Sequence, residues 1–362
     1  MTTPSADIDT TRLESYLATE IDTAVVETTV LSDGLNLVLT VTTADGGVEY
    51  VVRQAKELRD TDVFNDLRDE YALLCELEDT PIPTQRPVLF CDDESVLGDE
   101  FFVTTYVPGE PFPRGSFLPE RYQVPEAREH IATGLVDTLA EIHSLPVAQY
   151  EPHCSRWSPL KQVERATARL DATTDVTGRE MPTLRAVGDW LRENAPTESV
   201  TSLVHGDYRA GNVLFAGDQP EITAVLDWEA ALVGDPLTEL GYLLLDFRRD
   251  DDPRPSLDEI EAKYPEDALT GVRELHRDGL SPFGSKPGSP TRRELVDRYE
   301  DRTGLTFDHE QFYRAHAAFL LASVWADLGR QEVEAGGESS YAPIVDYMAL
   351  VADSITSGEF PL

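Results

Sequence analysis

Three oxygen-bearing side chains in the second half of the sequence have the types and the spacing to share one divalent cation. Residues 203–215 read LVHGDYRAGNVLF, an apolar run that is interrupted by Asp207 and, five positions later, by Asn212. Asp227 ends the next apolar run, EITAVLD. The intervening turn GDQP predicts a β-hairpin, which would bring Asn212 and Asp227 to neighbouring strand ends close to Asp207.

Oxygen-bearing side chains of these types suit a magnesium ion, and a neighbouring carboxylate suits a proton transfer. Two carboxylates and an amide oxygen are hard ligands, and Mg²⁺ completes its shell with water and substrate phosphates. A carboxylate left off the metal can accept the proton of an incoming hydroxyl group. Together these features are typical of phosphoryl transfer. The alternative is that Asp207 only caps a turn, which the presence of the other two side chains disfavours.

The composition excludes several other classes of protein. The chain has 362 residues, 41% of them hydrophobic, which is enough for a large core and two domains. Its 68 acidic and 30 basic residues give a net charge of -38, so we expect neither a nucleic-acid nor a membrane partner. The acidity is typical of proteins that work in concentrated salt. Acidic residues are scattered through apolar-periodic segments, which argues against disorder.

Cysteine content and the terminal sequence indicate the compartment. Cys75, Cys91 and Cys154 are an odd number without metal-binding spacing, in a chain too long to need disulfides. The N-terminal sequence MTTPSADIDTTRL lacks the regions of a signal peptide, and no apolar run approaches the ~20 residues of a membrane span. We therefore expect a cytoplasmic protein with free cysteines. Its oligomeric state is not indicated.

The predicted elements fall into a strand-rich part and a helical part, an α+β fold class. A Pro- and Gly-rich stretch at 107–113 predicts the boundary, giving domains 1–107 and 108–362. The loop 279–290, rich in Gly, Pro and Ser, predicts a flexible insertion. Periodicity predicts strands at 25–31, 35–43, 48–53, 86–92 and 100–107, a hairpin turn at 45–47, and helices at 10–20, 62–78, 128–146, 157–171, 181–194, 236–247, 291–302, 309–329 and 341–356.

Several segments of the sequence resemble those of a known family. HGDYRAGN followed by LDWE is similar to the catalytic loop and metal-binding segment of the aminoglycoside phosphotransferase and choline kinase-like family. The resemblance extends to LSDGLNLVLTV, YVVRQ, RDEYALL and VTTYVPGEPF in the first part of the chain. The motif order also resembles the kinase-like domain joined to some acyl-CoA dehydrogenases. The family resemblance implies a protein-kinase-like bilobal fold, with a small five-stranded antiparallel sheet in the N-terminal lobe and a larger helical C-terminal lobe.

The resemblance also implies roles for individual residues. Asp207 would be the catalytic base, Asn212 and Asp227 would hold Mg²⁺, and His205 would brace the loop. Arg53 stands where the protein-kinase pattern has a Lys; it would hold phosphates, although a plain surface cation is the alternative. The residues expected to bind ATP or GTP are Ser32, Gly34, Asn36, Arg53, its partner Glu70, Thr104, Tyr106 and Val107.

The nucleotide loop and several neighbouring side chains leave alternatives open. Gly34 is the only glycine of that loop, so a plain hairpin is the alternative to a phosphate cradle. Arg209 could touch the phosphate or the acceptor, Glu229 could face the substrate or the core, and Asp235 is expected to cap a helix. Two aromatic or amide side chains, Trp157 and Gln162, could line an acceptor cleft or only an amphipathic helix, and His143 is expected in the core.

The implied activity is transfer of the terminal phosphoryl group of ATP or GTP to a hydroxyl of a small molecule. The resemblance permits aminoglycosides, choline-like alcohols, sugars and hydroxyacyl thioesters as acceptors. The alternative is a catalytically silent nucleotide-binding or scaffold protein that has kept the fold.

Overall fold

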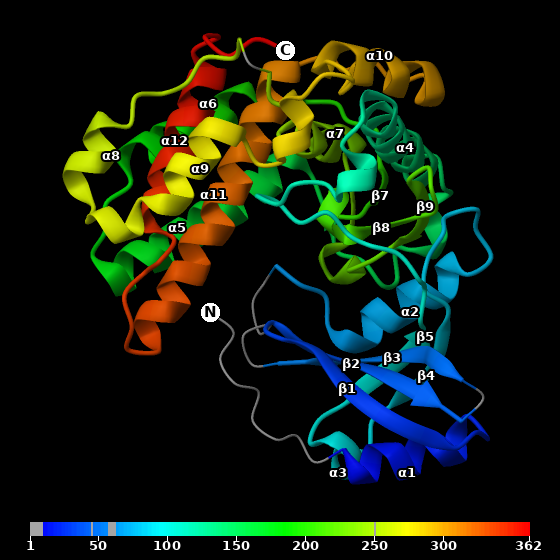
Figure 1. The fold of residues 1–362 in the computed structure, drawn as a ribbon. Coiled ribbons are helices and arrows are strands. Elements are labelled where there is room, and N and C mark those ends of the chain that lie inside the picture. The colour runs from blue at the N-terminus through cyan, green and yellow to red at the C-terminus, as the bar shows by residue number, and fades with distance from the viewer. Residues whose placement is uncertain (1–9, 45, 57–62, 250) are drawn as a thin grey trace.

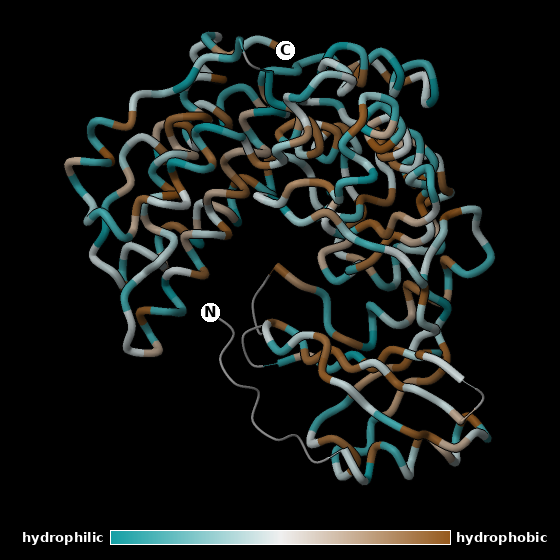
Figure 2. Tube along the Cα trace, viewed as in Figure 1, coloured by the Kyte–Doolittle hydropathy of each residue, from teal (hydrophilic) through white to brown (hydrophobic). Residues whose placement is uncertain are grey.

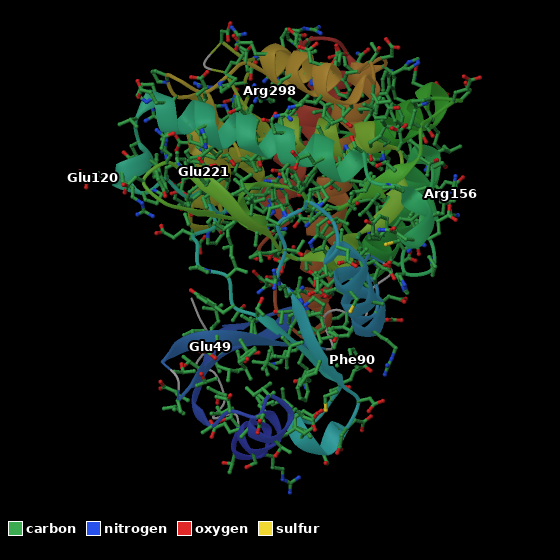
Figure 3. The ribbon with its side chains drawn as sticks, turned by 90° about the vertical axis from the view of Figure 1, so that its right-hand side faces the viewer. Glu49, Phe90, Glu120, Arg156, Glu221 and Arg298 are labelled. Atoms are coloured by element: carbon green, nitrogen blue, oxygen red, sulfur yellow. The ribbon has the colours of Figure 1, made fainter. Side chains whose placement is uncertain are left out.

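An antiparallel sheet and a larger helical assembly make up the molecule (Figure 1). The computed structural model describes residues 10–44, 46–56, 63–249 and 251–362. We call the elements from α1 to β5 the sheet lobe and those from α4 to α12 the helical lobe. The side view in Figure 3 shows Glu49 and Phe90 in the first, and Glu221 and Arg298 in the second. The expected α+β class with an N-terminal five-stranded sheet is confirmed.

The sheet has the strand order β1-β2-β3-β5-β4, and every neighbouring pair is antiparallel. Side chains alternate along β2, so that Leu37, Leu39 and Val41 are buried against α1 and α3. Helix α2 packs near β4 and β5. The bounds are α1 (Thr11–Glu20), β1 (Val25–Asp33), β2 (Asn36–Thr43), β3 (Gly47–Ala55), α2 (Leu67–Leu77), β4 (Pro87–Cys91), α3 (Glu94–Leu97) and β5 (Phe101–Thr105). Asp45 of the predicted turn lies outside the described residues.

The start of α2 was predicted five residues too early. The Asp66 side chain accepts a hydrogen bond from the Asp69 N–H at 2.8 Å, which caps the helix so that it begins at Leu67. Just before the cap, Asn65 donates its N–H to the Glu229 carbonyl at 2.7 Å and its side-chain amide to the Ala231 carbonyl at 2.8 Å. This segment therefore ties the two lobes together instead of extending the helix. Residue 62 lies outside the described residues.

Helix α11 is the centre of the helical lobe, since α5, α6, α7 and α12 all pack against it. Figure 2 shows hydrophilic residues along much of the outside of the helical lobe. The helices are α4 (Pro125–His143), α5 (Pro159–Thr177), α6 (Pro182–Asn194), α7 (Pro236–Leu244), α8 (Asp258–Lys263), α9 (Thr270–Asp278), α10 (Arg292–Thr303), α11 (Glu310–Glu334) and α12 (Ala342–Thr356). The strands are β6 (Arg156–Trp157), β7 (Ser202–Val204) and β10 (Leu232–Gly234) in one small sheet, and β8 (Val213–Ala216) with β9 (Glu221–Val225) in another.

Two further expectations are wrong in the helical lobe. Trp157 does not begin a helix, because Arg156 and Trp157 pair with β10, and Pro159 opens α5 instead. The loop 279–290 is not a free insertion, since Pro282, Phe283 and Gly284 are buried and the Phe283 ring contacts that of Phe247. Helices α8 and α9 were not predicted. No helix within the described residues is long and apolar enough to cross a bilayer.

The loop after β7 passes very close to another segment at Gly206. This residue has φ 86°, a conformation that side chains with a Cβ disfavour. A Cβ there would lie 2.1 Å from the Ala230 carbonyl oxygen, which is backbone and cannot rotate away. Glycine is therefore required at position 206 for two reasons: the positive φ angle and the lack of space for a Cβ.

A buried carboxylate accepts hydrogen bonds from the backbone of the loop that contains Gly206. Glu239, 2% exposed, accepts the Gly206 N–H at 2.6 Å and the His205 N–H at 2.9 Å, and it contacts His143 Nε2 at 3.1 Å. Tyr299 Oη lies 2.7 Å from His143 Nδ1. Burial alone would raise the pKa of Glu239, but hydrogen bonds from His143 and the backbone hold that pKa below its usual value. His143 is buried, as predicted for a core histidine.

We expect Gly206→Ala to destabilise the protein by about 2–4 kcal/mol, because it adds a steric clash to an unfavourable dihedral angle. Gly304→Ala is the matched control: Gly304 has φ 72° at the end of α10, and its Cβ would meet nothing within 4 Å. Its cost should be only about 1 kcal/mol. Urea unfolding in KCl measures both values, and equal costs would contradict the clash.

Glu239→Gln should cost about 2–3 kcal/mol at pH 7, because a buried charge-assisted network is broken. Since the folded pKa of Glu239 is lowered, its contribution is present above the unfolded pKa of about 4.3 and is lost as the pH falls through the folded pKa. The difference between wild type and variant should therefore shrink toward acid pH. Urea unfolding at several pH values tests this, with the half-exposed Glu151→Gln as the control. A difference that grows on acidification would refute it.

Candidate active site

A cleft of about 1070 Å³ opens between the sheet lobe and the helical lobe. Its floor is formed by the 205–212 loop and by residues 226–232, and its roof by strands of the sheet. One end of the helical wall is formed by α5 and α11. Ligand sites are commonly clefts of roughly 300–1000 Å³ at such lobe interfaces. This cleft is large enough for two small molecules side by side.

Asp207 lies on the floor of the cleft and is held by three donors. Asn212 Nδ2 donates to Asp207 Oδ2 at 2.8 Å, and the Tyr242 hydroxyl donates to Asp207 Oδ1 at 2.6 Å. Arg209 Nε lies 3.3 Å from both oxygens. The carboxylate is thus fixed in orientation while its side chain remains about one-third exposed to the cleft.

The β8–β9 hairpin brings Asn212 and Asp227 together as the sequence predicted. Val213 pairs with Val225, and the Leu226 N–H donates to the Asn212 carbonyl at 2.8 Å. Asp227 has φ 61°, a left-handed conformation that is uncommon for any residue other than glycine and is concentrated at functional sites. Its side chain is 40% exposed and faces the cleft.

Arg53, on β3, joins three carboxylates from different segments. Its guanidinium lies 3.2 Å from Glu70 on α2, 2.6 Å from Asp227 and 2.5 Å from Glu229. Burial opposes ionisation of Asp227, but Arg53 outweighs it and holds the pKa of Asp227 below its usual range. Glu229 also accepts a hydrogen bond from the Asn36 side chain at 2.7 Å. The predicted pairing of Arg53 with Glu70 is therefore present, and two further acids join it.

The remaining nucleotide candidates divide into two groups. Ser32, Thr104, Tyr106 and Val107 line the cleft with Asn36 and Arg53, along the roof and the segment that leaves β5. The Tyr106 N–H donates to the Glu49 carbonyl at 2.7 Å. Gly34 lies at the β1–β2 turn, where its N–H donates to the Asn36 carbonyl, and it is not part of the cleft wall.

Two candidates support the site from outside the cleft. His205 is fully buried; its Nε2 lies 2.7 Å from the Leu226 carbonyl, and its Nδ1 accepts the Asp207 N–H at 3.2 Å. Asp235 caps α7 by accepting the Leu237 N–H at 3.0 Å, and the Tyr313 hydroxyl donates to its other oxygen at 2.7 Å. Burial raises the pKa of Asp235.

Sequence reasoning missed three residues that touch this machinery. Glu239 and Tyr242 lie three residues apart on α7, so they share the face that meets the 205–212 loop; helical spacing from the cap at Asp235 could have indicated both. Arg114 donates to the Tyr242 hydroxyl at 2.8 Å and to Asp246 at 2.9 Å. No local signal marks Arg114, because its partners lie more than 120 positions away.

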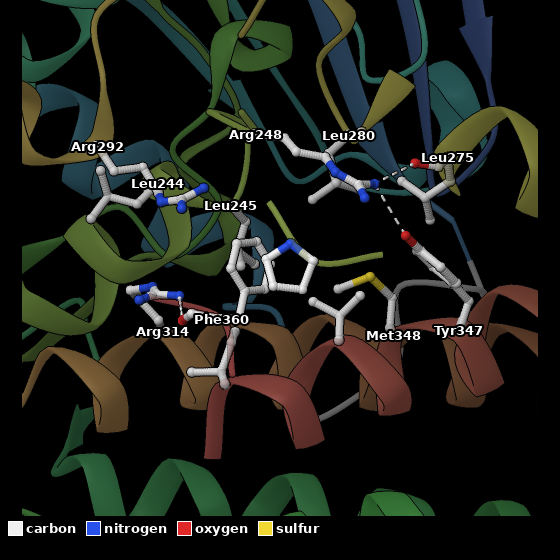
Figure 4. A pocket seen from close by; sticks show the side chains of 14 residues that line it. Leu244, Leu245, Arg248, Leu275, Leu280, Arg292, Arg314, Tyr347, Met348 and Phe360 are labelled. Carbon is white, nitrogen blue, oxygen red and sulfur yellow. Dashed lines mark hydrogen bonds between the residues drawn. The ribbon is translucent and has the colours of Figure 1, made fainter. Parts of the chain in front are cut away.

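A second cavity, inside the helical lobe, is much smaller at about 40 Å³ (Figure 4). Three buried arginines face it, but each has protein partners. Arg248 donates to the Leu275 and His276 carbonyls at the end of α9 and to the Tyr347 hydroxyl. Arg292 pairs bidentately with Asp252, and Arg314 pairs with Glu310. These contacts identify a structural cluster that links segments of the helical lobe to one another.

Two of the candidate residues have the donor chemistry of a magnesium site. Both hydrogen bonds that described residues receive from the Asn212 side chain leave from Nδ2, to the carbonyl and the carboxylate of Asp207, so that Oδ1 can serve a cation. Asp227 adds a carboxylate that faces the cleft. Two protein oxygens beside an open cleft fit an ion that takes the rest of its shell from water and phosphates. Within the described residues, no group of three or more His, Cys, Asp or Glu forms an all-protein metal site.

Comparison with known proteins agrees with this geometry. The model of the phosphotransferase enzyme family, APH, matches residues 27–275. Human acyl-CoA dehydrogenase family member 11 is 31% identical over 172 residues, which is 45% of this chain and 21% of that protein. Mouse family member 10 is 26% identical over 277 residues, 75% of this chain and 24% of that protein. The chain thus spans about a quarter or less of the length of these relatives.

Solved structures share the fold at low sequence identity. A Ralstonia eutropha protein provisionally described as an aminoglycoside phosphotransferase has a TM-score of 0.73 at 22% identity, covering 97% of this chain and 98% of that one. The GDP and kanamycin complex of APH(2")-IIIa has a TM-score of 0.59 at 15% identity, covering 96% and 98%. A macrolide 2'-phosphotransferase of type I has a TM-score of 0.58 at 18% identity, covering 94% and 97%.

The family match covers well over half of the chain, and the strand order, the HGDYRAGN loop and the LDWE segment agree with it. The chain therefore belongs to the APH phosphotransferase enzyme family and has its α+β, protein-kinase-like fold.

Proposed function

We propose that this protein is a small-molecule kinase that transfers the terminal phosphoryl group of ATP or GTP to a hydroxyl group. In this proposal residues 1–107 form the nucleotide-binding lobe, and residues 108–362 carry the 205–212 loop and the acceptor site. The nucleotide base would lie against the segment from Thr104 to Val107. Mg²⁺ would be held by Asn212 and Asp227 and would neutralise phosphate charge.

One observation carries the proposal: Asp207 and Asp227 line the floor of an open cleft, the buried Asn212 lies against Asp207, and a cation on β3 contacts Asp227. Asn212 contacts Asp207 directly at 2.8 Å, and its carbonyl accepts the N–H of the residue before Asp227. Arg53 lies 2.6 Å from Asp227. A proton acceptor, two metal ligands and a phosphate-binding cation are the parts that phosphoryl transfer needs.

The chain's own groups have separate tasks in this mechanism. Asp207 accepts the proton of the acceptor hydroxyl as the hydroxyl oxygen attacks the terminal phosphorus. Arg53 forks onto nucleotide phosphates, which are planar bidentate partners for a guanidinium, and Glu70 holds it in place from behind. Tyr242 and Asn212 keep the carboxylate of Asp207 aimed at the cleft. His205 and Glu239 fix the backbone of the loop.

A catalytically silent nucleotide-binding or scaffold protein is the second candidate, and one observation favours it. Arg53 pairs with Asp227 and Glu229 in this structure. The guanidinium that is proposed to bind phosphate therefore neutralises Asp227, a proposed metal ligand. A kinase must exchange these contacts for nucleotide and Mg²⁺. Retention of all three groups at positions 207, 212 and 227 argues for the kinase.

Binding of MgATP should separate the two candidates. We expect MgATP to raise the melting temperature in KCl, and chelation of the metal to remove most of that rise, because Asp227 and Asn212 would hold the ion that accompanies the nucleotide. At a concentration of 100 times Kd the stabilisation would be about 2.7 kcal/mol. Asp227→Asn should weaken the response, whereas the exposed-turn variant Asp218→Asn should not. A response that is identical with and without metal would refute the assigned metal site.

Replacement of the base should abolish turnover and leave nucleotide binding intact. With a pool of hydroxylated metabolites as acceptors, Asp207→Asn should slow ADP release at least about 100-fold, because general-base catalysis contributes that much or more. The affinity for MgATP should stay within about twofold of wild type, since the acceptor hydroxyl is the only bound group that Asp207 would contact in this mechanism. Asp218→Asn again serves as the control. Unchanged turnover in Asp207→Asn would overturn the assigned base, and binding without turnover in wild type would favour the scaffold.

A further inference from the structure

Two buried polar side chains in the wall of the cleft lack the hydrogen bonds that buried polar groups normally form. Gln162 on α5 is 6% exposed and His316 on α11 is 1% exposed, and both line the cleft. Among the residues that the structure describes, Gln162 Nε2 has no hydrogen-bond partner, and the same holds for both ring nitrogens of His316. Because an unpaired buried polar group costs folding free energy, two of them in one wall indicate a role other than stabilising the fold.

Both side chains lie where α5 packs against α11 (Figure 1). The His316 ring faces the Pro159 carbonyl in the first turn of α5, and Gln162 follows Pro159 by three residues, on the same face of that helix. The Gln162 amide lies beside β10, since a Cβ on Gly234 would be 3.7 Å from Nε2 of that amide. The imidazole and the amide therefore belong to one part of the cleft wall.

This part of the wall is close to the proposed base. The backbone of Tyr313, three residues before His316 on α11, packs against Gly241 of α7, where a Cβ would lie 2.6 Å from the Tyr313 carbonyl oxygen. The residue after Gly241 is Tyr242, which donates its hydroxyl to Asp207 at 2.6 Å. Asp207, Tyr242 and His316 all line the same cleft. A ligand that binds beside His316 therefore lies on the same side of the cleft as Asp207.

The pair offers hydrogen bonds without charge. Burial lowers the pKa of the His316 imidazole to about 3, and the Pro159 carbonyl, which acts in the opposite direction, does not offset this shift. The ring is therefore neutral at pH 7, with one N–H donor and one acceptor nitrogen, and the Gln162 amide likewise has a donor and an acceptor. Neither side chain can compensate the desolvation of an ion, whereas both can pair with a neutral group.

We propose that Gln162 and His316 recognise an uncharged polar group of the acceptor, a carboxamide or a second hydroxyl, which both donates and accepts hydrogen bonds. This inference rests on the proposed kinase function and narrows its substrate class. Leu320 and Val324 follow His316 at helical spacing on α11 and also line the cleft, so they contact the hydrocarbon next to that group. In the reaction, a bond forms between the oxygen of the acceptor's other hydroxyl and the terminal phosphorus, the bond to the nucleoside diphosphate breaks, and Asp207 takes the hydroxyl proton.

Four probes of equal chain length test the inference without phosphoryl transfer: hexanamide, 1-hexanol, hexanoate and hexylammonium. Each is titrated in KCl at pH 7 while tryptophan fluorescence is recorded, to which Trp157 and Trp325 in the cleft contribute. We expect hexanamide or 1-hexanol to bind saturably and at least about tenfold tighter than both ions, because neutral partners do not repay the desolvation of a charge. The tighter of the two neutral probes identifies the recognised group. An ion that binds as tightly as the neutral probes, or no saturable binding of either neutral probe, would overturn the inference.

Variants that remove the polar atoms should weaken binding without weakening the fold. Gln162→Met and His316→Phe should each reduce the affinity for the tighter neutral probe at least about fivefold, the equivalent of one hydrogen bond. The melting temperature should stay unchanged or rise, because the amide and ring nitrogens that are removed have no partner among the described residues. If His316→Phe fails to fold, His316→Leu replaces it.

Gln311→Met on α11 is the matched control, because the Gln311 amide is paired and is not part of the cleft wall. Its Nε2 donates to the Ile355 and Thr356 carbonyls, both at 2.9 Å, so the melting temperature of this variant should fall while probe binding is retained. Affinity that Gln162→Met and His316→Phe both leave unchanged would refute the recognition role. A melting temperature that falls as far in these variants as in the control would assign both side chains to the fold and also overturn the inference.

MgATP stabilisation, measured on the same wild-type preparation, keeps this result distinct from a test of the kinase itself. Stabilisation by MgATP without selective binding of a neutral probe overturns only the acceptor class. Selective binding of a neutral probe without MgATP stabilisation supports the recognition role of Gln162 and His316 and overturns the proposed kinase function.

Discussion

The contact of one buried guanidinium with three carboxylates is the interaction on which the rest of the site depends. Arg53 meets Glu70, Asp227 and Glu229, which come from a helix of the sheet lobe and from the LDWE segment of the helical lobe. Without a cation between them, these acids would repel one another in a poorly solvated space. Burial alone would lower the pKa of Arg53, yet the three acids raise it above its ordinary value. The same charge therefore joins the lobes and keeps the proposed metal ligand ionised.

Helix α7 extends this constraint to the proposed base. Its N-terminus is capped by Asp235, and its next turns carry Glu239 under the loop backbone and Tyr242 against the Asp207 carboxylate. Gly206 can approach Ala230 closely only because it has no side chain. The loop is thus fixed by a short helix whose contacts are specific at every turn. A base held by rigid neighbours loses less by misorientation than one on a free loop.

Short-range patterns in the sequence predicted the parts of this arrangement that depend on neighbours in the chain. The hairpin that brings Asn212 to Asp227 follows from a turn and two alternating runs, and the β-strands of the sheet follow from alternation. The pairing of Arg53 with Glu70 came from the resemblance. Long-range contacts were not predictable in this way. Arg114 reaches Tyr242 across 128 positions, and nothing within its own segment indicates that contact.

The errors have the same physical origin. Periodicity placed the start of α2 before its cap, but Asn65 bonds instead to carbonyls of residues 229 and 231. Composition made 279–290 a flexible insertion, whereas the burial of Phe283 against Phe247 is a tertiary contact that composition does not encode. Charge composition shows most clearly what sequence composition cannot predict about a site. A net charge of -38 describes the chain as a whole, while the described residues that line the cleft include both acids, such as Asp207 and Asp227, and arginines, such as Arg53 and Arg209, so any preference for the sign of a ligand's charge follows from the local arrangement and not from the sum.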